Sequence, residues 1–294
     1  MKIRSAFTMI ELVFVIVIMG ILGKFGVEFM FQAYNSFIFS KVNNTLQANS
    51  ANALEFIASR LQYRIKDSVI ARDNSSFDAI NSIDTSKSYI GLEWVSTDID
   101  GYRSDTTPNW SGIIDLNNTN ADKDTLISPE TNTTEISNLI KILSHDTNKT
   151  IDNAAIYFIG SNSDVNGYGW DGSTITDQSQ VMHPIKAGAS INILKPRVSD
   201  FSGVDVYEYY KLAWTANAIR IESENAANHT FKLEFYFDHQ PWDGETFTDG
   251  KHFTIMENIS TFQFTAIGSI MKIQICAKTT LLEKYSLCKE KTVF

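Results

Sequence analysis

Acidic and amide side chains recur at alternate positions in three polar segments, which is the spacing at which oxygen ligands can surround a calcium ion. The segments are DIDG, DLNNTNADKD and SDVNGYGWD, and the candidate ligands are Asp98, Asp100, Asp115, Asn117, Asp122, Asp164, Asn166 and Asp171. None of the segments completes an EF-hand loop, which needs Gly at its sixth position and Glu at its twelfth. We therefore predict solvated polar loops, with calcium binding as the alternative.

A glycine pattern in the third segment raises the question of nucleotide binding. Gly167, Gly169 and Gly172 spell G-x-G-x-x-G, the fingerprint of dinucleotide-binding proteins. That fingerprint binds a pyrophosphate only when a strand precedes it and a helix follows it. Here polar loop sequence lies on both sides, so the pattern predicts a glycine-rich surface loop and no nucleotide site.

Hydrolytic chemistry has no support in the sequence. There is no G-x-S-x-G motif, and no Ser, His and Asp occur at a spacing that indicates a catalytic triad. His229, His239 and His252 lie near the loop DHQPWDGETFTDG, where we expect histidines at the surface ends of strands. Trp242 in that loop is expected to be a half-buried anchor, or else an exposed contact for a partner. We predict that the protein is not an enzyme.

The overall composition limits the class of partner. The chain has 294 residues, 43% of them hydrophobic, and a net charge of -9 at pH 7. The sequence pI is about 5.1. A nucleic-acid-binding surface is normally basic, so we expect no nucleic-acid partner.

The elements that would position these residues are mostly strands. In TFKLEFYFD, Phe231, Leu233 and Phe235 alternate with polar side chains, as in a strand with one buried face. Similar short runs recur from residue 154 onward, YIGLEWV reads as an earlier strand, and TFQFTAIGSIMKIQI indicates a hairpin that turns at 267–269. SNLIKILSHD predicts a short helix. Together these patterns predict an α+β fold in which a long helix covers one face of an antiparallel sheet.

The longest apolar run lies at the N-terminus. From Phe7 to Leu22 each residue is apolar, Gly or Thr, except Glu11, and Lys2 and Arg4 precede the run. The run is long enough to cross a bilayer, and the basic residues predict that residues 1–6 stay in the cytoplasm. A cleaved secretory signal would need a small-residue exit site after Leu22, and none is present. An ordinary membrane anchor explains the length but not Glu11, because a carboxylate at the bilayer centre costs roughly 2.5–3.5 kcal/mol.

A basic leader ending in a small residue, followed by F-T-x-I-E and an unbroken apolar run, resembles the N-terminal signal of type IV pilins and type II secretion pseudopilins. The resemblance implies that a prepilin peptidase cuts between Ala6 and Phe7 and methylates the new N-terminus at Phe7. Glu11 then occupies the position of the family's glutamate and pairs with the Phe7 amine of a neighbouring subunit. The alternative is that Glu11 extends to the lipid headgroups. Ala6 replaces the Gly that usually precedes the cut.

The same resemblance implies partners and a location. The partners are other pilin or pseudopilin subunits, the peptidase, the inner-membrane assembly platform and membrane lipid. The protein would be a single-pass protein of the bacterial inner membrane, with a cytoplasmic N-terminus and a periplasmic head. Lys24 and Glu28 interrupt the apolar segment, which favours a minor pseudopilin of a secretion system. A minor subunit of a type IV or competence pilus is the alternative, and a membrane-anchored periplasmic binding domain is the remote one.

The predicted organisation has four parts: a leader at 1–6, a transmembrane or filament-core helix at 7–31, an amphipathic continuation of that helix at 32–70, and a globular head at 71–294. A single helix could reach from Phe7 to about Val69, because no proline occurs before Pro108. Cys276 and Cys288 are the only cysteines and enclose eleven residues. In an exported domain we expect them to form a disulfide, and many type IV pilins have a similar C-terminal disulfide region.

Overall fold

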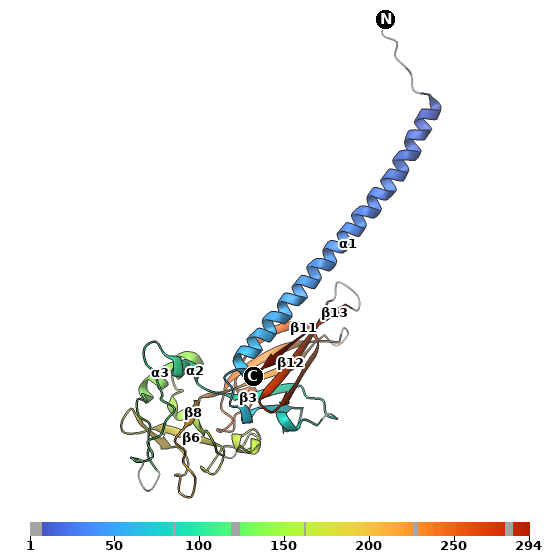
Figure 1. The fold of residues 1–294 in the computed structure, drawn as a ribbon. Helices are drawn as coiled ribbons and strands as arrows, with labels where there is room; N and C mark the ends of the chain where they lie inside the picture. The colour runs from blue at the N-terminus through green and yellow to red at the C-terminus, as the bar shows by residue number, and fades with distance from the viewer. Residues whose placement is uncertain (1–7, 85, 119–123, 162, 226–228, 280–284) are drawn as a thin grey trace.

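The fold is that of a computed structural model, which describes residues 8–84, 86–118, 124–161, 163–225, 229–279 and 285–294. It has a long N-terminal helix, α1 (Met9–Leu61), whose first half projects away from a head built of two antiparallel sheets (Figure 1). The predicted α+β class is therefore confirmed at this level.

The first sheet contains eight of the described strands in the order β13-β12-β11-β10-β9-β3-β1-β2, each antiparallel to its neighbours. Five of them follow one another as a meander, as the strand-rich second half of the sequence predicts. The strands are β1 (Ile70–Arg72), β2 (Phe77–Ala79), β3 (Gly91–Ser96), β9 (Thr215–Asn225), β10 (Thr230–His239), β11 (Lys251–Ile267), β12 (Ile270–Lys278) and β13 (Ser286–Val293).

The second sheet belongs to residues 97–214, which we call the inserted lobe. Its described strands are arranged β4-β7-β6-β5-β8, with β4 (Leu126–Ile127), β5 (Ala155–Phe158), β6 (Met182–Ala187), β7 (Ile193–Pro196) and β8 (Tyr210–Ala213). The lobe also holds α2 (Ile99–Arg103) and α3 (Thr133–Ser144), the latter over the predicted short helix. The lobe enters and leaves between β3 and β9, which pair directly at Ser96 and Thr215.

Short 3-10 turns complete the described structure: Lys66–Ser68, Ile80–Ser82, Ile151–Asn153, Val165–Tyr168 and Phe247–Asp249. The hairpin between β11 and β12 turns at Gly268 and Ser269, as predicted. Gly268 has φ +60°, a left-handed conformation that glycine adopts more readily than other residues.

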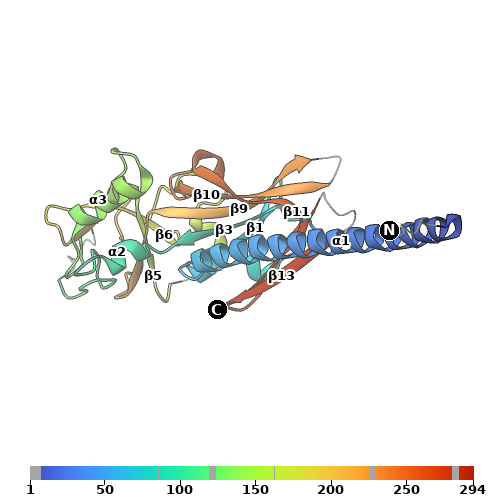
Figure 2. The same ribbon diagram turned by 90° about the horizontal axis from the view of Figure 1, so that it is seen from above.

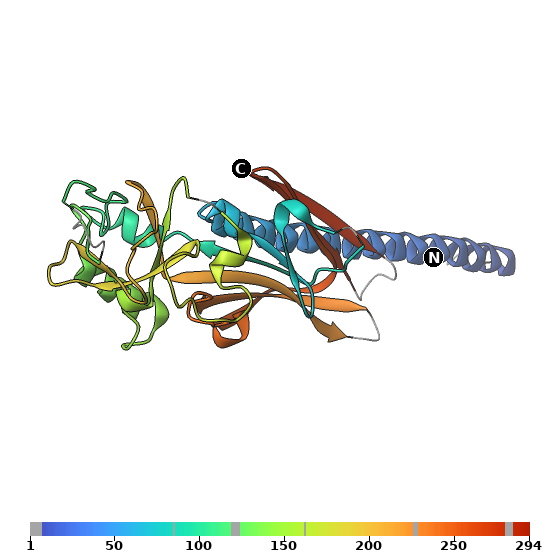
Figure 3. The same cartoon turned by 90° about the horizontal axis from the view of Figure 1, so that it is seen from below.

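The second half of α1 lies against the concave face of the first sheet, beside β13, β12, β11 and β3 (Figures 2 and 3). One side of the helix is buried there, through Val42, Leu46, Ala53, Leu54, Ile57 and Leu61. It packs on alternating strand residues such as Ile273 and Ile275. Each Leu or Ile buried in this way stabilises the fold by about 1.5–3 kcal/mol, so this contact holds the helix to the head.

The helix ends at Leu61 and not near Val69, where the apolar spacing predicted its end. Arg64 explains the difference. Its Nη1 donates to the Leu61 carbonyl and its Nη2 donates to the Ser269 carbonyl at 2.7 Å. The guanidinium therefore satisfies a carbonyl at the end of α1 and fastens that end to the β11–β12 turn.

Candidate functional site: the exposed half of the long helix

The first half of α1 has no packing partner within the described chain. Its large apolar side chains are exposed by between 48% at Val15 and 87% at Met9, and this part of the helix stands clear of the head in two views (Figures 1 and 2). Within the described residues, α1 is the one helix that is long and apolar enough to cross a membrane. A bare apolar surface of this length is stable only when lipid or other apolar helices cover it.

The first turn of α1 contains the single acidic residue of the apolar run. Thr8 is the N-cap, and its N–H and hydroxyl both donate to the same Glu11 carboxylate oxygen, Oε2, at 3.0 and 2.9 Å. Thr8 Oγ1 in turn accepts the Glu11 N–H at 3.4 Å. This reciprocal arrangement is a capping box. In the described residues the other oxygen, Oε1, accepts no hydrogen bond.

The capping box was missed in the sequence, although its signature was present. Thr8-Met9-Ile10-Glu11 has the S/T-x-x-E form that starts many helices. The resemblance to pilins implied a role for Glu11 toward another subunit, and the capping box adds a role within its own turn. Ala6 and Phe7, the residues of the predicted cleavage site, lie outside the described residues.

The two charges that interrupt the apolar run are one helical turn apart. Lys24 Nζ lies 3.9 Å from Glu28 Oε1. At about 1.5 Å per residue, these residues stand roughly 22 and 28 Å along the helix from Met9. The hydrocarbon core of a bilayer is about 30 Å thick. If Met9 lies at one boundary, the pair lies close to the other, where long side chains can reach water.

The calcium candidates are used mainly by their own backbone. Asp115, Asp164 and Asp171 each accept the N–H of the residue two positions later, at 3.0 to 3.1 Å. Asp98 accepts the Gly101 N–H at 3.1 Å and caps α2. These are Asx turns and an N-cap, and the D-x-N or D-x-S spacing indicates them as directly as it indicates a metal. No group of three or more His, Cys, Asp or Glu side chains suited to a metal occurs in the described residues, and Asp122 lies outside them.

The structure buries three parts of the head that we predicted to lie wholly or partly at the surface. The glycine segment is buried at Gly167–Trp170, because Gly169, with φ +85°, lies directly against the backbone at Pro241 and Trp242. Trp242 is fully buried and donates from Nε1 to the Asn153 carbonyl at 3.0 Å. His239 is also fully buried, at the end of β10. Hydrophobic contacts between the inserted lobe and the first sheet cover this region, and the local sequence contains no sign of them.

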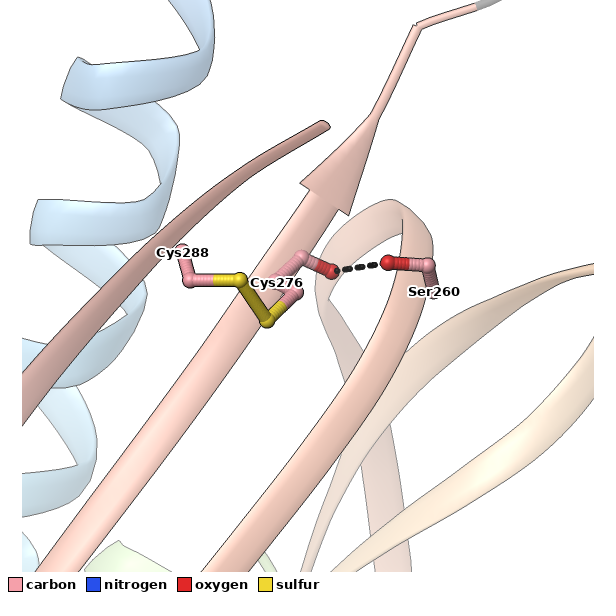
Figure 4. The surroundings of a disulfide bond; sticks show 3 residues. All are labelled: Ser260, Cys276 and Cys288. Atoms are coloured by element: carbon pink, nitrogen blue, oxygen red, sulfur yellow. Dashed lines mark hydrogen bonds between the residues drawn. A yellow bond between two sulfur atoms is a disulfide. The ribbon is translucent and has the colours of Figure 1, made fainter. Parts of the chain in front are cut away.

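The predicted disulfide is present. Cys276 of β12 and Cys288 of β13 face each other in the strand register and are bonded (Figure 4). The Ser260 hydroxyl of β11 donates to the Cys276 carbonyl at 3.1 Å (Figure 4). The bond therefore joins the edge strand of the first sheet to its neighbour, and β13 also packs along α1.

Comparison with known proteins identifies no relative: no protein-family model, no curated protein and no solved structure matches the chain.

Proposed function

We propose that the protein is a pilin-like structural subunit, a minor pseudopilin of a type II secretion system. A prepilin peptidase would process it between Ala6 and Phe7. The observation that carries the proposal is the bare apolar half of α1, with one carboxylate in its first turn directly after a basic leader. A filament whose core is a bundle of such helices would cover this surface, and the inner membrane would cover it before assembly.

Glu11 supplies the charge that such a bundle has to neutralise. Its Oε1 accepts no hydrogen bond from the described residues, and Glu11 follows Phe7 by four residues in the sequence. Pairing of Glu11 with the amine of a neighbouring subunit would neutralise both charges away from water and would fix the axial register of the two helices.

The Lys24–Glu28 pair favours a minor, low-copy subunit of the filament over the major subunit that forms most of it. Two further charges in a helix bundle need a local environment that accepts them, and a repeating core would have to provide this at every subunit. A subunit used once or a few times needs only one such site.

The experiment is mass spectrometry of the N-terminus of protein expressed in cells with and without a prepilin peptidase. We expect methylated Phe7 only with the peptidase. A chain that keeps Met1 in both strains would overturn the proposal and would favour a permanent membrane anchor.

Assembly is tested with Glu11→Ala and with the matched control Glu28→Ala, which removes a carboxylate from the same helix. We expect Glu11→Ala to be cleaved but absent from the filament fraction, and Glu28→Ala to be cleaved and assembled. Wild-type assembly of Glu11→Ala would rule out the pairing role.

A further inference from the structure

A groove at the junction of α1 and the inserted lobe has the chemistry of a docking site. It has a volume of about 470 Å³ and lies between the residues that follow α1 and the edge of β8. We call it the junction groove. Four large apolar side chains on its walls are 40% to 53% exposed: Tyr102, Ile113, Ile159 and Tyr209. Soluble surfaces seldom gather so many exposed apolar side chains unless a partner covers them.

The floor of the groove is rigid and aromatic. Trp110 is buried beneath Tyr102, with ring centroids 4.9 Å apart, and lies 5.7 Å from Tyr210. The Trp110 Nε1 donates to the Asp98 carbonyl at 3.1 Å. The Tyr210 hydroxyl forms a hydrogen bond with the Ser128 hydroxyl, with 2.9 Å between the two oxygens. An apolar ligand group would therefore meet a surface that is already ordered and loses little freedom on binding.

One end of the groove is cationic. Lys211 is half-buried in the wall of the groove and makes no hydrogen bond or ion pair with the described residues. Burial lowers its pKa, and the positive charges of Lys66 and Arg64 lower it further. The carboxylate of Asp67 raises the pKa of Lys211 and so acts in the opposite direction. Lys211 and Arg64 both line the groove in a chain of net charge -9, and Lys66 is near enough to act on Lys211. A bound anion would offset this local repulsion.

We propose that the junction groove docks a segment of another protein that carries an aromatic or aliphatic side chain beside one or two carboxylates. The apolar part would lie on Tyr102 and Tyr209, and the carboxylate would pair with Lys211. Ile113 and Ile159 favour a protein side chain over a sugar, because branched aliphatic walls offer a sugar no hydrogen bonds.

A lipid headgroup is disfavoured by position. The groove begins at Gln62, whereas the last large exposed apolar residue of α1 is Phe39. The 22 residues from Phe39 to Leu61 extend about 33 Å along the helix, so the groove stands well clear of a membrane that contains the first half of α1. Nucleic acid is disfavoured because it needs a continuous cationic track along its phosphates. The proposal does not depend on processing at Phe7 or on filament assembly.

The test is fluorescence anisotropy of the full-length protein in detergent micelles with labelled peptides. The first probe is acetyl-Asp-Glu-Phe-Glu-Asp-amide, and the others replace the four acidic residues with Lys or the Phe with Gly. We expect the acidic peptide with Phe to bind at least tenfold more tightly than either other peptide. Equal binding of the acidic and basic peptides would overturn the proposal.

Variants locate the binding. Lys211→Glu and Lys211→Gln should each weaken binding of the acidic peptide at least tenfold, Tyr209→Ala should weaken it similarly, and Lys211→Arg should retain it. The matched control is Lys186→Glu, an exposed lysine on β6 of the same lobe. Circular dichroism checks that each variant is folded. Unchanged binding in both folded Lys211 variants would overturn the proposal, as would a weakening by Lys186→Glu equal to that by Lys211→Glu.

Two further probes separate other occupants. A labelled oligothymidylate and vesicles containing phosphatidylglycerol should bind no more tightly to the wild type than to Lys211→Glu. Binding of either that requires Lys211 and exceeds that of the acidic peptide would replace the protein segment with a nucleic acid or a lipid surface.

Discussion

Thr8 and Glu11 close the first turn of α1 on each other. Thr8 donates its N–H at 3.0 Å and its hydroxyl at 2.9 Å to Glu11 Oε2, and Thr8 Oγ1 accepts the Glu11 N–H at 3.4 Å. The residue that we propose as an assembly contact is thus also part of the start of its own helix. The capping box holds the carboxylate in place before any neighbour arrives, which reduces the entropy that pairing would cost.

Thr8→Val should loosen this turn, because valine has the shape of threonine without its hydroxyl. Loss of an N-cap side chain costs about 1 kcal/mol, so exchange of the Glu11 amide proton should become about fivefold faster. Hydrogen exchange measured by NMR in micelles checks this. Thr8→Ser keeps the hydroxyl and should retain wild-type protection. Equal exchange in Thr8→Val and wild type would show that the hydroxyl does not hold the turn.

Removal of the disulfide by Cys276→Ala together with Cys288→Ala should lower the free energy of unfolding by about 3 kcal/mol on the loop-entropy model. The bond restrains the unfolded chain over eleven enclosed residues. Urea unfolding of the full-length protein under non-reducing conditions measures the loss. Ser260→Ala, which removes the hydrogen bond to the Cys276 carbonyl, should cost about 1 kcal/mol. A double variant as stable as the wild type would contradict the prediction.

His239 should make the head less stable in acid. Burial, reinforced by the positive charges of Lys149 and Arg72, lowers the pKa of His239 to about 3, whereas an unfolded histidine titrates near 6.5. Stability is therefore complete above pH 6.5 and falls as the pH drops toward 3, because the unfolded chain binds the proton and the folded chain does not. Burial also lowers the pKa of His183, to about 4. His183 therefore adds a second loss of stability as the pH falls.

His239→Leu isolates the contribution of His239 to the loss of stability in acid. Between pH 6 and pH 4, the free energy of unfolding of the variant should fall less steeply than that of the wild type, by up to about 1.4 kcal/mol per pH unit. Urea titrations at several pH values measure the two slopes. Parallel slopes would mean that His239 takes up its proton as readily in the folded chain as in the unfolded one.

Asp98 has the opposite effect on the pH dependence of stability, because its ionised form destabilises the head at high pH. Burial raises the pKa of its carboxyl to about 6, so the ionised form costs stability at pH 8, and this cost disappears as the pH falls below about 4. Asp98→Asn can still accept the Gly101 N–H. We expect it to stabilise the head at pH 8 by about 2–3 kcal/mol, an upper bound from the pKa difference, and to have no effect near pH 4. Asp105→Asn, which changes an exposed carboxylate beyond the end of α2, is the control and should change stability at neither pH.

The sequence predicted features that depend on local pattern. The alternation in TFKLEFYFD gives β10, and Gly268 gives the hairpin turn between β11 and β12. Apolar spacing in residues 46–61 gives the buried side of α1. In each case the residues that form the element are close together in the chain, and the spacing of their apolar side chains or the turn glycine reveals it.

Features made by distant residues could not be predicted in this way. The end of α1 depends on a bond from Arg64 to Ser269, and His239 and Trp242 are buried by contacts with the inserted lobe. The junction groove joins side chains from Tyr63, Tyr102 and Tyr209 that no local motif connects. The Asx turns are a different case, because their D-x-N and D-x-S signal is local, whereas the same residues led us to predict only solvated polar loops, with calcium binding as the alternative.

The position of the inserted lobe has a consequence for the order of events during folding. Pairing of Ser96 with Thr215 closes a loop that contains the whole lobe, and an unstructured loop of that length costs about 3 kcal/mol more to close than a four-residue turn. Within the lobe, the Asp98 N–H donates to the Leu212 carbonyl at 2.8 Å, so a folded lobe already brings its two ends together. β3 can then join β9 at little entropic cost. A lobe that folds first would thus speed the assembly of the sheet that holds α1.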